Sequence, residues 1–419
     1  MKSIINYTVL KFYKYKYILL LVLFKCNVNF PVFKTGVKRK NSVKNLPAIN
    51  KKKTILIIDS NIPKYDCSAG ERTTWQYIEV FLDMGFEVFF MPADFKEIQP
   101  YSKELLNKGV KCLCGDFYNK NYDLWIMENG NSIDYVLLNR PRISIEYIEL
   151  LKKYTNAGII YYGMDIHHIR EAGHYSVTND IKHLKSSKYL KKMELYLYEK
   201  SDVVITVSSL EADTIKKYGY DKTEVFPAYY YKDFNVEQYI PEKRKDILFV
   251  GGGVHLPNSD ALVWFINEIF PEFAKENGKV NFIIVGGYDK DFVEKYSSDN
   301  VLFKLSVSDA ELKKIYNSVK IVVVPLRFGA GIKGKTVEAG YYGVPVVSTD
   351  FGIEGLKGIN DIIVPKNGSG EFTEELIKLY NDNKKLKEIS LKFSVYVKNN
   401  FSYDAAKEKI KNILEKAYL

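Results

Sequence analysis

One stretch toward the carboxyl end, residues 319–356, constrains the fold of this chain more than any other. It reads VKIVVVPLRFGAGIKGKTVEAGYYGVPVVSTDFGIEGL. Except for Lys320, Val319–Pro325 is an apolar, largely β-branched run, which predicts a strand buried on both faces. Lys335–Tyr342 can form about two helical turns, and Val344–Ser348 predicts the next buried strand. Strand, glycine loop, helix and strand in this order predict part of an open parallel α/β sheet, whose ligands bind at the carboxyl ends of the strands.

The glycine loop between the first strand and the helix has the composition of a phosphate site. Gly329 and Gly331 let the backbone approach a ligand with no Cβ in the way. The helix N-terminus offers free N–H groups and a partial positive charge, and Lys333 and Lys335 add full charges. Glu338 follows within about one turn, where its carboxylate can accept hydrogen bonds from hydroxyl groups.

The segment FGAGIKGKTVEAGYYGVPVVSTDFGIEGL resembles the donor-binding segment of the retaining, nucleotide-sugar-dependent glycosyltransferases called group 1. In that family a Glu followed by a small residue binds the ribose of the donor, and Glu338-Ala339 matches it. Ala330 stands where the family often carries a second Glu. The run before the lysines is similar to that of a subgroup with Arg-Phe-Gly-Ala-Gly, so we add Arg327, and also Glu354 of the next loop, to the expected donor-binding residues.

The resemblance implies an α/β protein with the GT-B architecture, in which two doubly wound Rossmann-like domains face each other across a cleft. It covers most of residues 54–419 and is strongest after Asp246. The expected donor is a nucleotide sugar, which is a substrate, so no cofactor is expected. We assign Lys335 a catalytic role, because a cation fixed beside the leaving nucleoside diphosphate stabilises the charge that develops there.

The alternation of strand and helix patterns predicts the domain organisation and most strands. The expected parts are an arm (1–53), an acceptor-side α/β domain (54–227), a linker (228–245), a donor-binding α/β domain (246–400) and a C-terminal helix that crosses back (401–419). Strands are expected at Thr54–Asp59, Glu87–Met91, Tyr135–Leu138, Gly158–Tyr161 and Val203–Val207, and, in the second domain, at Val280–Gly286 and Asp361–Pro365.

Two loops of the first domain carry candidate site residues. Gly70 follows the first strand; it either leaves room for a ligand or only shapes the turn. Asp165, His167 and Arg170 follow the strand GIIYY at a carboxyl edge, where related enzymes carry Asp-x-His or a single His beside the reacting sugar. Asp165 could orient His167, His167 could bond the sugar or acceptor, and Arg170 could bind a phosphate. The alternative for all three is a solvated loop.

The second domain opens with a strand that runs into Gly251, Gly252 and Gly253. Backbone N–H groups of this loop could meet a pyrophosphate, and Asn258 or Ser259 is expected to cap the helix that follows. The GxGxxG fingerprint is absent, which disfavours a nicotinamide enzyme. Four of the five histidines lie between His167 and His183, but no pair has His-x-x-x-His spacing, so we expect no metal site.

The excess positive charge lies wholly in the arm. Of the 61 Lys and Arg residues, 13 fall in residues 1–53, which hold none of the 51 Asp and Glu residues. Residues 54–419 therefore carry 48 basic and 51 acidic residues, a net charge of −3, which argues against nucleic acid as a partner. Ile18–Phe24 is an apolar run of seven, too short to span a bilayer. The arm suits either an anionic membrane surface or a disordered extension.

The resemblance implies a glycosyltransferase, and we expect it to be cytoplasmic, peripheral on the inner face of the membrane if the arm binds lipid. The four cysteines show neither zinc nor disulfide spacing, in keeping with reduced thiols. The expected reaction moves a sugar to a glycan or lipid-linked acceptor in cell-surface polysaccharide synthesis. Two alternatives remain: a GT-B nucleotide-sugar epimerase, and a non-catalytic relative that binds glycan or membrane.

Overall fold

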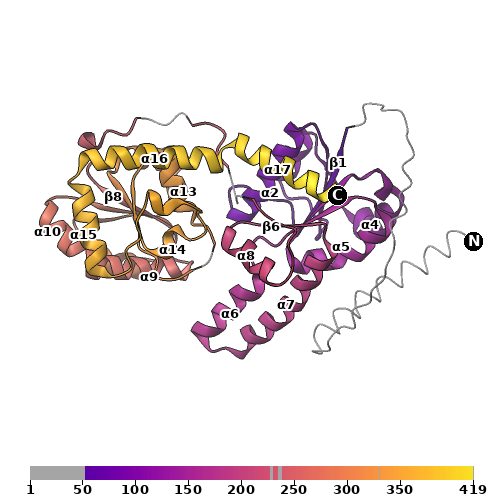
Figure 1. Cartoon of the computed structure of the whole chain (residues 1–419), viewed down its shortest axis with the longest axis horizontal. Coiled ribbons are helices and arrows are strands. Elements are labelled where there is room, and N and C mark those ends of the chain that lie inside the picture. The colour runs from indigo at the N-terminus through magenta and orange to yellow at the C-terminus, as the bar shows by residue number, and fades with distance from the viewer. Residues whose placement is uncertain (1–51, 227–229, 235–237, 330, 419) are drawn as a thin grey trace, which may run out of the picture. The chain divides into compact units, whose positions relative to one another are not determined.

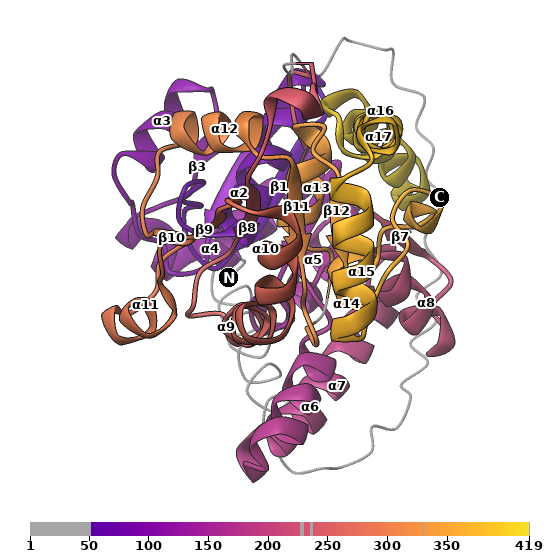
Figure 2. The same cartoon turned by 90° about the vertical axis from the view of Figure 1, so that its left-hand side faces the viewer.

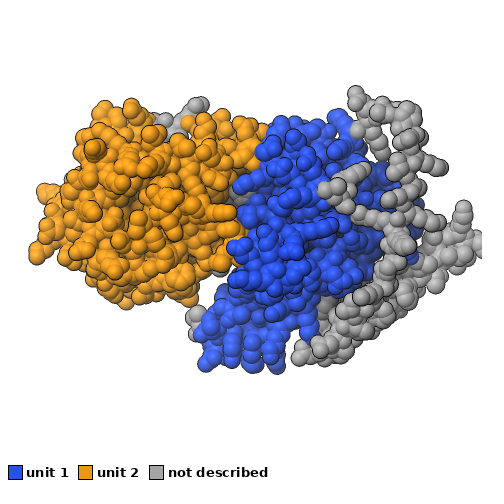
Figure 3. All heavy atoms as spheres, viewed as in Figure 1, with its two compact units in different colours: residues 1–206, 211–228, 407–419 blue, residues 207–210, 229–406 orange. Residues whose placement is uncertain are grey.

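The computed structural model describes residues 52–226, 230–234, 238–329 and 331–418 (Figure 1). The basic arm and Ala330 lie outside the described residues. The chain divides into two compact units, which Figure 3 shows in different colours. Among the described residues, unit 1 contains those within 52–206, 211–226 and 407–418, and unit 2 contains those within 207–210 and 230–406.

Unit 1 is built on a seven-stranded sheet in which every pairing is parallel, with the order β3-β2-β1-β4-β5-β6-β7. The central strands are apolar apart from polar residues at their ends, and they are buried throughout because helices cover both faces of the sheet (Figure 1). The order reverses direction at β1, with β2 on one side and β4 on the other, so β1 and β4 end side by side at the switch point. The strands are β1 (Thr54–Asp59), β2 (Glu87–Pro92), β3 (Lys111–Cys112), β4 (Tyr135–Asn139), β5 (Gly158–Tyr162), β6 (Val203–Thr206) and β7 (Thr223–Val225).

The helices of unit 1 include a long pair that extends away from the sheet. These are α6 (His167–Thr178) and α7 (Ile181–Lys200), which pack against each other as a hairpin (Figure 1). The turn between them places Asn179 in a left-handed conformation, with Asp180 capping α7 through a bond from the Lys182 backbone N–H. The other helices are α2 (Ala69–Asp83), α3 (Tyr101–Asn107), α4 (Asp116–Asn129), α5 (Pro141–Tyr154) and α8 (Ser209–Lys217).

Unit 2 has a five-stranded parallel sheet in the order β10-β9-β8-β11-β12 (Figure 2). Here the order reverses at β8, which lies between β9 and β11. The loops that leave β8 and β11 therefore meet at one carboxyl edge. The strands are β8 (Ile247–Val250), β9 (Phe282–Val285), β10 (Val301–Lys304), β11 (Ile321–Val324) and β12 (Val346–Ser348). The helices are α9 (Leu256–Trp264), α10 (Phe270–Asn277), α11 (Lys290–Tyr296), α12 (Asp309–Ser318), α13 (Gly334–Tyr341), α14 (Asp350–Ile353), α15 (Ser369–Tyr380) and α16 (Asn383–Phe401).

The strand expected at Asp361–Pro365 is wrong. A short 3-10 turn, Ile359–Asp361, occupies its start, and the following residues pair with no strand of the described chain. The single helix expected after the first glycine loop is also interrupted, because a π turn over Phe265–Ile269 separates α9 from α10. Helix α12 begins after Ser308, which forms the full capping box with Glu311.

The last helix, α17 (Tyr403–Tyr418), is divided between the units, with unit 1 beginning again at Lys407. Its apolar residues Ile410, Ile413 and Leu414 are buried in unit 1, near Tyr77 and Phe226. No described helix is both long enough and apolar enough to cross a membrane. The described cysteines, Cys67, Cys112 and Cys114, are free thiols.

Candidate active site

In unit 2 the structure brings the two predicted glycine loops together around Lys335. The Nζ atom of Lys335 donates to Asn258 Oδ1 at 2.6 Å and lies 4.1 Å from the centre of the Phe249 ring. A methyl group on Gly251 would lie 2.6 Å from the same Nζ atom and 2.7 Å from Asn258 Nδ2, so a side chain there would displace these two groups. Gly251, from the loop after β8, and Lys335, from the first turn of α13, therefore form one site.

The environment of Lys335 disfavours its charge. Burial, and then the neighbouring charge of Lys333, lower the pKa of Lys335 to about 7. The same positive charges, after burial, lower the pKa of His255. A negatively charged ligand beside Lys335 would stabilise its protonated form, which burial and Lys333 destabilise. The site therefore favours a ligand that carries negative charge.

Lys333 is held differently, although it lies only two residues away. It is the N-cap residue of α13 and is buried, and its Nζ atom donates to Glu354 Oε2 at 3.0 Å and to the Gly331 carbonyl at 2.5 Å. Lys333, Glu354 and Gly331, three residues expected in donor binding, thus contact one another. The ion pair fixes the loop that precedes α13, and Gly331 adopts a φ of 76°, which favours glycine.

Glu338 lies on α13 beside a fully buried tyrosine. Its Oε2 atom accepts a hydrogen bond of 2.9 Å from the Tyr316 hydroxyl, and Tyr342 stacks on the Tyr316 ring. Burial, followed by the Glu338 charge, raises the pKa of Tyr316 well above its usual range, so Tyr316 remains a donor at physiological pH. This bond orients the Glu338 carboxylate.

Arg327, the other expected donor-binding cation, is already engaged. Its Nε and Nη2 atoms form a two-point contact with the carboxylate of Asp260, and its guanidinium lies 5.7 Å from the centre of the Trp264 ring. The contact with Asp260 also raises the pKa of Arg327. Arg327 thus links the loop after β11 to α9, and the two guanidinium nitrogens that could bind a phosphate contact Asp260 instead.

The glycine loop after β8 is held by side chains that the sequence analysis assigned otherwise. Asn258 and Ser259 do not cap α9, whose N-cap residue is His255. Instead, Asn258 donates to the Gly252 carbonyl at 2.9 Å, and Ser259 donates to the Gly253 carbonyl at 3.0 Å. Their hydrogen bonds turn back to the loop because α9 begins earlier than expected, at Leu256.

In unit 1 the loop after β5 brings Asp165 and His167 together as expected, and Arg170, which was expected to bind a phosphate, also contacts Asp165. The Nε2 atom of His167 lies 3.1 Å from Asp165 Oδ1 and 2.9 Å from the Gly163 carbonyl. Arg170 Nη1 donates to the other oxygen of Asp165. Because both groups that Nε2 contacts are hydrogen-bond acceptors, we assign the proton of the neutral ring to Nε2. Nδ1 is then an acceptor. Burial, more than the opposing effect of Asp165, lowers the pKa of His167.

A buried glutamate that sequence reasoning missed holds this loop in place. Glu194 of α7 is fully buried and accepts hydrogen bonds from the backbone N–H groups of His167 and His168, at 2.8 and 3.1 Å. It also contacts His168 Nδ1 at 2.6 Å, and His168 Nε2 lies 3.0 Å from the Tyr218 hydroxyl. His168 is therefore part of the support of α6. In the sequence, Glu194 stands among the apolar positions of α7, and this departure from the helical pattern could have identified it as a buried, functional or structural charge.

One cluster in the described part of the chain could hold a metal ion. Glu171 and His174 of α6 and His183 of α7 place one ligand atom each within 4.8 Å of the others. The Nδ1 atom of His183 lies 3.0 Å from Glu171 Oε2, so this contact joins the two helices. The expectation from residue spacing did not foresee this grouping, because the ligands come from two antiparallel helices.

Residues 244–382 match the family model described as "Glycosyl transferases group 1". The match indicates a glycosyltransferase. It spans both glycine loops of unit 2, Lys335 and Glu338, whereas Asp165 and His167 of unit 1 lie outside the matched residues. An uncharacterized 44.6 kDa protein from the cps region of Klebsiella pneumoniae is 25% identical over 308 residues, 69% of this chain and 73% of that protein.

Solved glycosyltransferase structures share the fold of most of this chain. Sucrose-phosphate synthase from Thermosynechococcus elongatus has a TM-score of 0.63 at 14% identity and covers 88% of this chain and 99% of its own. TarM has a TM-score of 0.64 at 14% identity, covering 87% and 99%. HepE from Anabaena, solved with UDP and glucose, has a TM-score of 0.60 at 14% identity, covering 87% and 99%. The two Rossmann-like units are those of a GT-B fold.

Proposed function

We propose that this glycosyltransferase moves a sugar from a nucleotide-activated donor to a glycan or glycolipid acceptor, with retention of configuration, in cell-surface polysaccharide synthesis. The observation that carries the proposal is the position of Lys335 beside Gly251, with Glu338 one turn further along α13. Lys335 and Glu338 lie on the same short helix. The lysine can bind the diphosphate of a nucleotide sugar, and the carboxylate can accept hydrogen bonds from its ribose hydroxyls. The relative from a cps region supports the polysaccharide role.

The proposed chemistry depends on charge stabilisation. Breaking the bond between the sugar's anomeric carbon and the diphosphate places negative charge on the leaving phosphate oxygens. Lys335 and the N–H groups at the start of α13 would neutralise this charge. The proposal gives a metal ion no part in this step.

The proposal is tested by nucleotide release. HepE was solved with UDP-glucose, so UDP-glucose and UDP are the first ligands to try in a thermal-shift screen of nucleotide sugars. The donor found there is then incubated with candidate glycan acceptors. Acceptor-dependent release of nucleotide is the expected result. Binding without release would show a non-catalytic protein, and conversion of the donor's sugar without acceptor would show an epimerase.

Glu338→Gln should weaken donor binding about tenfold or more, because a hydrogen bond to a charged group contributes about 1.5–3 kcal/mol. The amide can still accept from Tyr316, so the fold should survive. Titration calorimetry with the identified donor measures the effect, and Glu374→Gln, at an exposed position on α15, is the control. Unchanged donor affinity, with only a small loss of stability, would instead assign Glu338 to supporting Tyr316 and the helix.

Removal of residues 1–53 should abolish binding to anionic membranes and leave donor binding intact. The arm, which lies outside the described residues, carries 13 positive and no negative charges around an apolar run, and such segments are attracted to anionic lipid. Co-sedimentation with phosphatidylglycerol vesicles measures the effect, with phosphatidylcholine vesicles as the control. The arm has no membrane role if full-length and shortened proteins sediment equally.

A further inference from the structure

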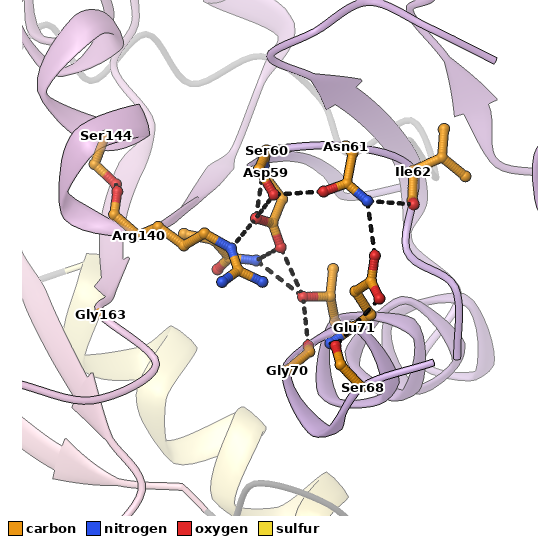
Figure 4. A network of polar contacts seen from close by, with 12 residues as sticks. Asp59, Ser60, Asn61, Ile62, Ser68, Gly70, Glu71, Arg140, Ser144 and Gly163 are labelled. Atoms are coloured by element: carbon orange, nitrogen blue, oxygen red, sulfur yellow. Dashed lines mark hydrogen bonds and ion pairs between the residues drawn. The ribbon is translucent and has the colours of Figure 1, made fainter. Parts of the chain in front are cut away.

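A second charged cluster lies in unit 1, at the carboxyl ends of β1 and β4 (Figure 4). Its centre is Asp59, the last residue of β1, which is only 2% exposed. One carboxylate oxygen accepts from Thr74 Oγ1 at 2.8 Å and Asn139 Nδ2 at 3.0 Å, and the other accepts from Arg140 Nε at 2.7 Å. A buried carboxylate is costly unless it is paired and hydrogen-bonded, and Arg140 supplies the opposite charge.

Arg140 reaches Asp59 through an unusual backbone conformation. Its φ is 65° and its ψ is 134°, an arrangement that costs a residue with a side chain on the order of 1–3 kcal/mol. Hydrogen bonds hold it on both sides: its N–H donates to the Tyr162 carbonyl at 2.9 Å, and its own carbonyl accepts from Ser144 Oγ at 2.7 Å. The turn between β4 and α5 therefore fixes the direction of the Arg140 side chain.

The contact with Asp59 uses only one corner of the guanidinium. Arginine commonly binds a carboxylate through two parallel hydrogen bonds, as Arg327 binds Asp260 in unit 2. Arg140 uses Nε alone, and its two Nη atoms, with four N–H groups, have no hydrogen-bond acceptor among the described residues. The side chain is 29% exposed, so these groups remain accessible.

The surroundings of the Nη groups leave space. A methyl group on Gly70, near the start of α2, would lie 3.4 Å from Arg140 Nη2, so glycine keeps the approach open on that side. The nearest acidic residue on α2, Glu71, is turned toward Asn61, whose Nδ2 donates to it at 2.8 Å, and away from Arg140 (Figure 4). The N-terminus of α2 adds a favourable field for an anion.

We propose that the Nη groups of Arg140, positioned by Asp59, bind an oxyanion of the acceptor, so that the acceptor of this enzyme carries a phosphate or carboxylate group. This inference rests on the proposed function, and it assigns the acceptor's chemical class. The donor's diphosphate has its own cations, Lys333 and Lys335, in unit 2. A purely structural ion pair would not require a strained arginine that leaves four of its five guanidinium N–H groups without an acceptor among the described residues.

The test uses the full chain saturated with UDP, which occupies the donor's phosphate site if the proposed function is correct. D-glucuronate and inorganic phosphate are titrated by calorimetry, with glucose as the neutral control. The unaltered protein should bind at least one of the two anions and not glucose, and the preferred anion tells carboxylate from phosphate. Arg140→Lys keeps a positive charge for Asp59 but lacks the planar fork, and should weaken that binding at least tenfold. Arg142→Gln, at an exposed position on α5, should bind as the unaltered protein does.

Three results would overturn the inference. The first is that neither anion binds; the second is that Arg140→Lys, shown to be folded by its melting curve, binds the anion normally. The third is that Arg140→Lys weakens the binding of UDP itself, measured without the anions, which would assign Arg140 to the donor. Failure of UDP to bind the unaltered protein would count against the proposed function, and the anion titrations would still report on Arg140.

Discussion

Lys335→Ala should lower kcat about 100-fold, the lower range for the loss of one electrostatic donor, and change the KM for the donor much less. An interaction that strengthens as charge develops on the leaving diphosphate is lost mainly from kcat. The alternative is a lysine that only packs between Asn258 and Phe249. Steady-state kinetics on the identified donor distinguish the two, with Lys378→Ala on α15 as the control.

The same lysine should make donor binding depend on pH. Its pKa of about 7 in the empty protein is lowered by burial and by Lys333, and a bound diphosphate favours the charged form. Below pH 7 the lysine is already protonated, so affinity is at its maximum. Above pH 7 a proton must be taken up on binding, and affinity should fall toward tenfold per pH unit. A flat profile in the unaltered protein, or the same slope in Lys335→Ala, would show that another group holds the phosphates.

His167→Ala should also lower kcat about 100-fold, at the lower end of the range for a positioned acid–base group. With its proton on Nε2, facing Gly163 and Asp165, the ring presents Nδ1 as an acceptor for a hydroxyl of the sugar or acceptor. Because burial lowers the pKa of His167, the neutral form should persist below pH 6.5, where an ordinary histidine becomes protonated. Kinetics between pH 5.5 and 8 measure both effects.

His174 provides the matched control for this prediction. It lies on the same helix two turns away and is exposed, so His174→Ala should retain full activity. His168→Ala should instead lower the melting temperature, since it leaves buried Glu194 without a side-chain partner. Normal turnover in a folded His167→Ala protein would assign the ring to holding the loop after β5.

Sequence reasoning worked where the chemistry is local. The two glycine loops and the buried strands each depend on residues within a few positions, and they lie where they were expected, apart from the strand at Asp361–Pro365. The loop with Asp165 and His167 was found in the same way, as a polar run after an apolar strand. The short strands β3 and β7 escaped notice because two or three residues show no measurable alternation.

Long-range pairing could not be predicted in this way. The contact between Asp59 and Arg140 joins residues 81 positions apart, and the contact between Lys335 and Asn258 spans 77. Asn258 fitted the pattern of a helix cap equally well, and only the position of α13 shows which bond it makes. A strand needs a neighbouring strand to pair with as well as an apolar pattern. The apolar residues of Asp361–Pro365 have no such partner in the described chain, and a turn forms at their start instead.

The division of α17 between the units has a consequence for how the protein is made. Unit 1 contains the first strand, yet its core includes Ile410, Ile413 and Leu414 from near the end of the chain. When all strands of unit 1 have left the ribosome, the C-terminal helix that covers part of their sheet has not yet been synthesised. The first domain to emerge is therefore the last to be completed, and it waits, with that apolar surface exposed, until the whole of unit 2 has been synthesised.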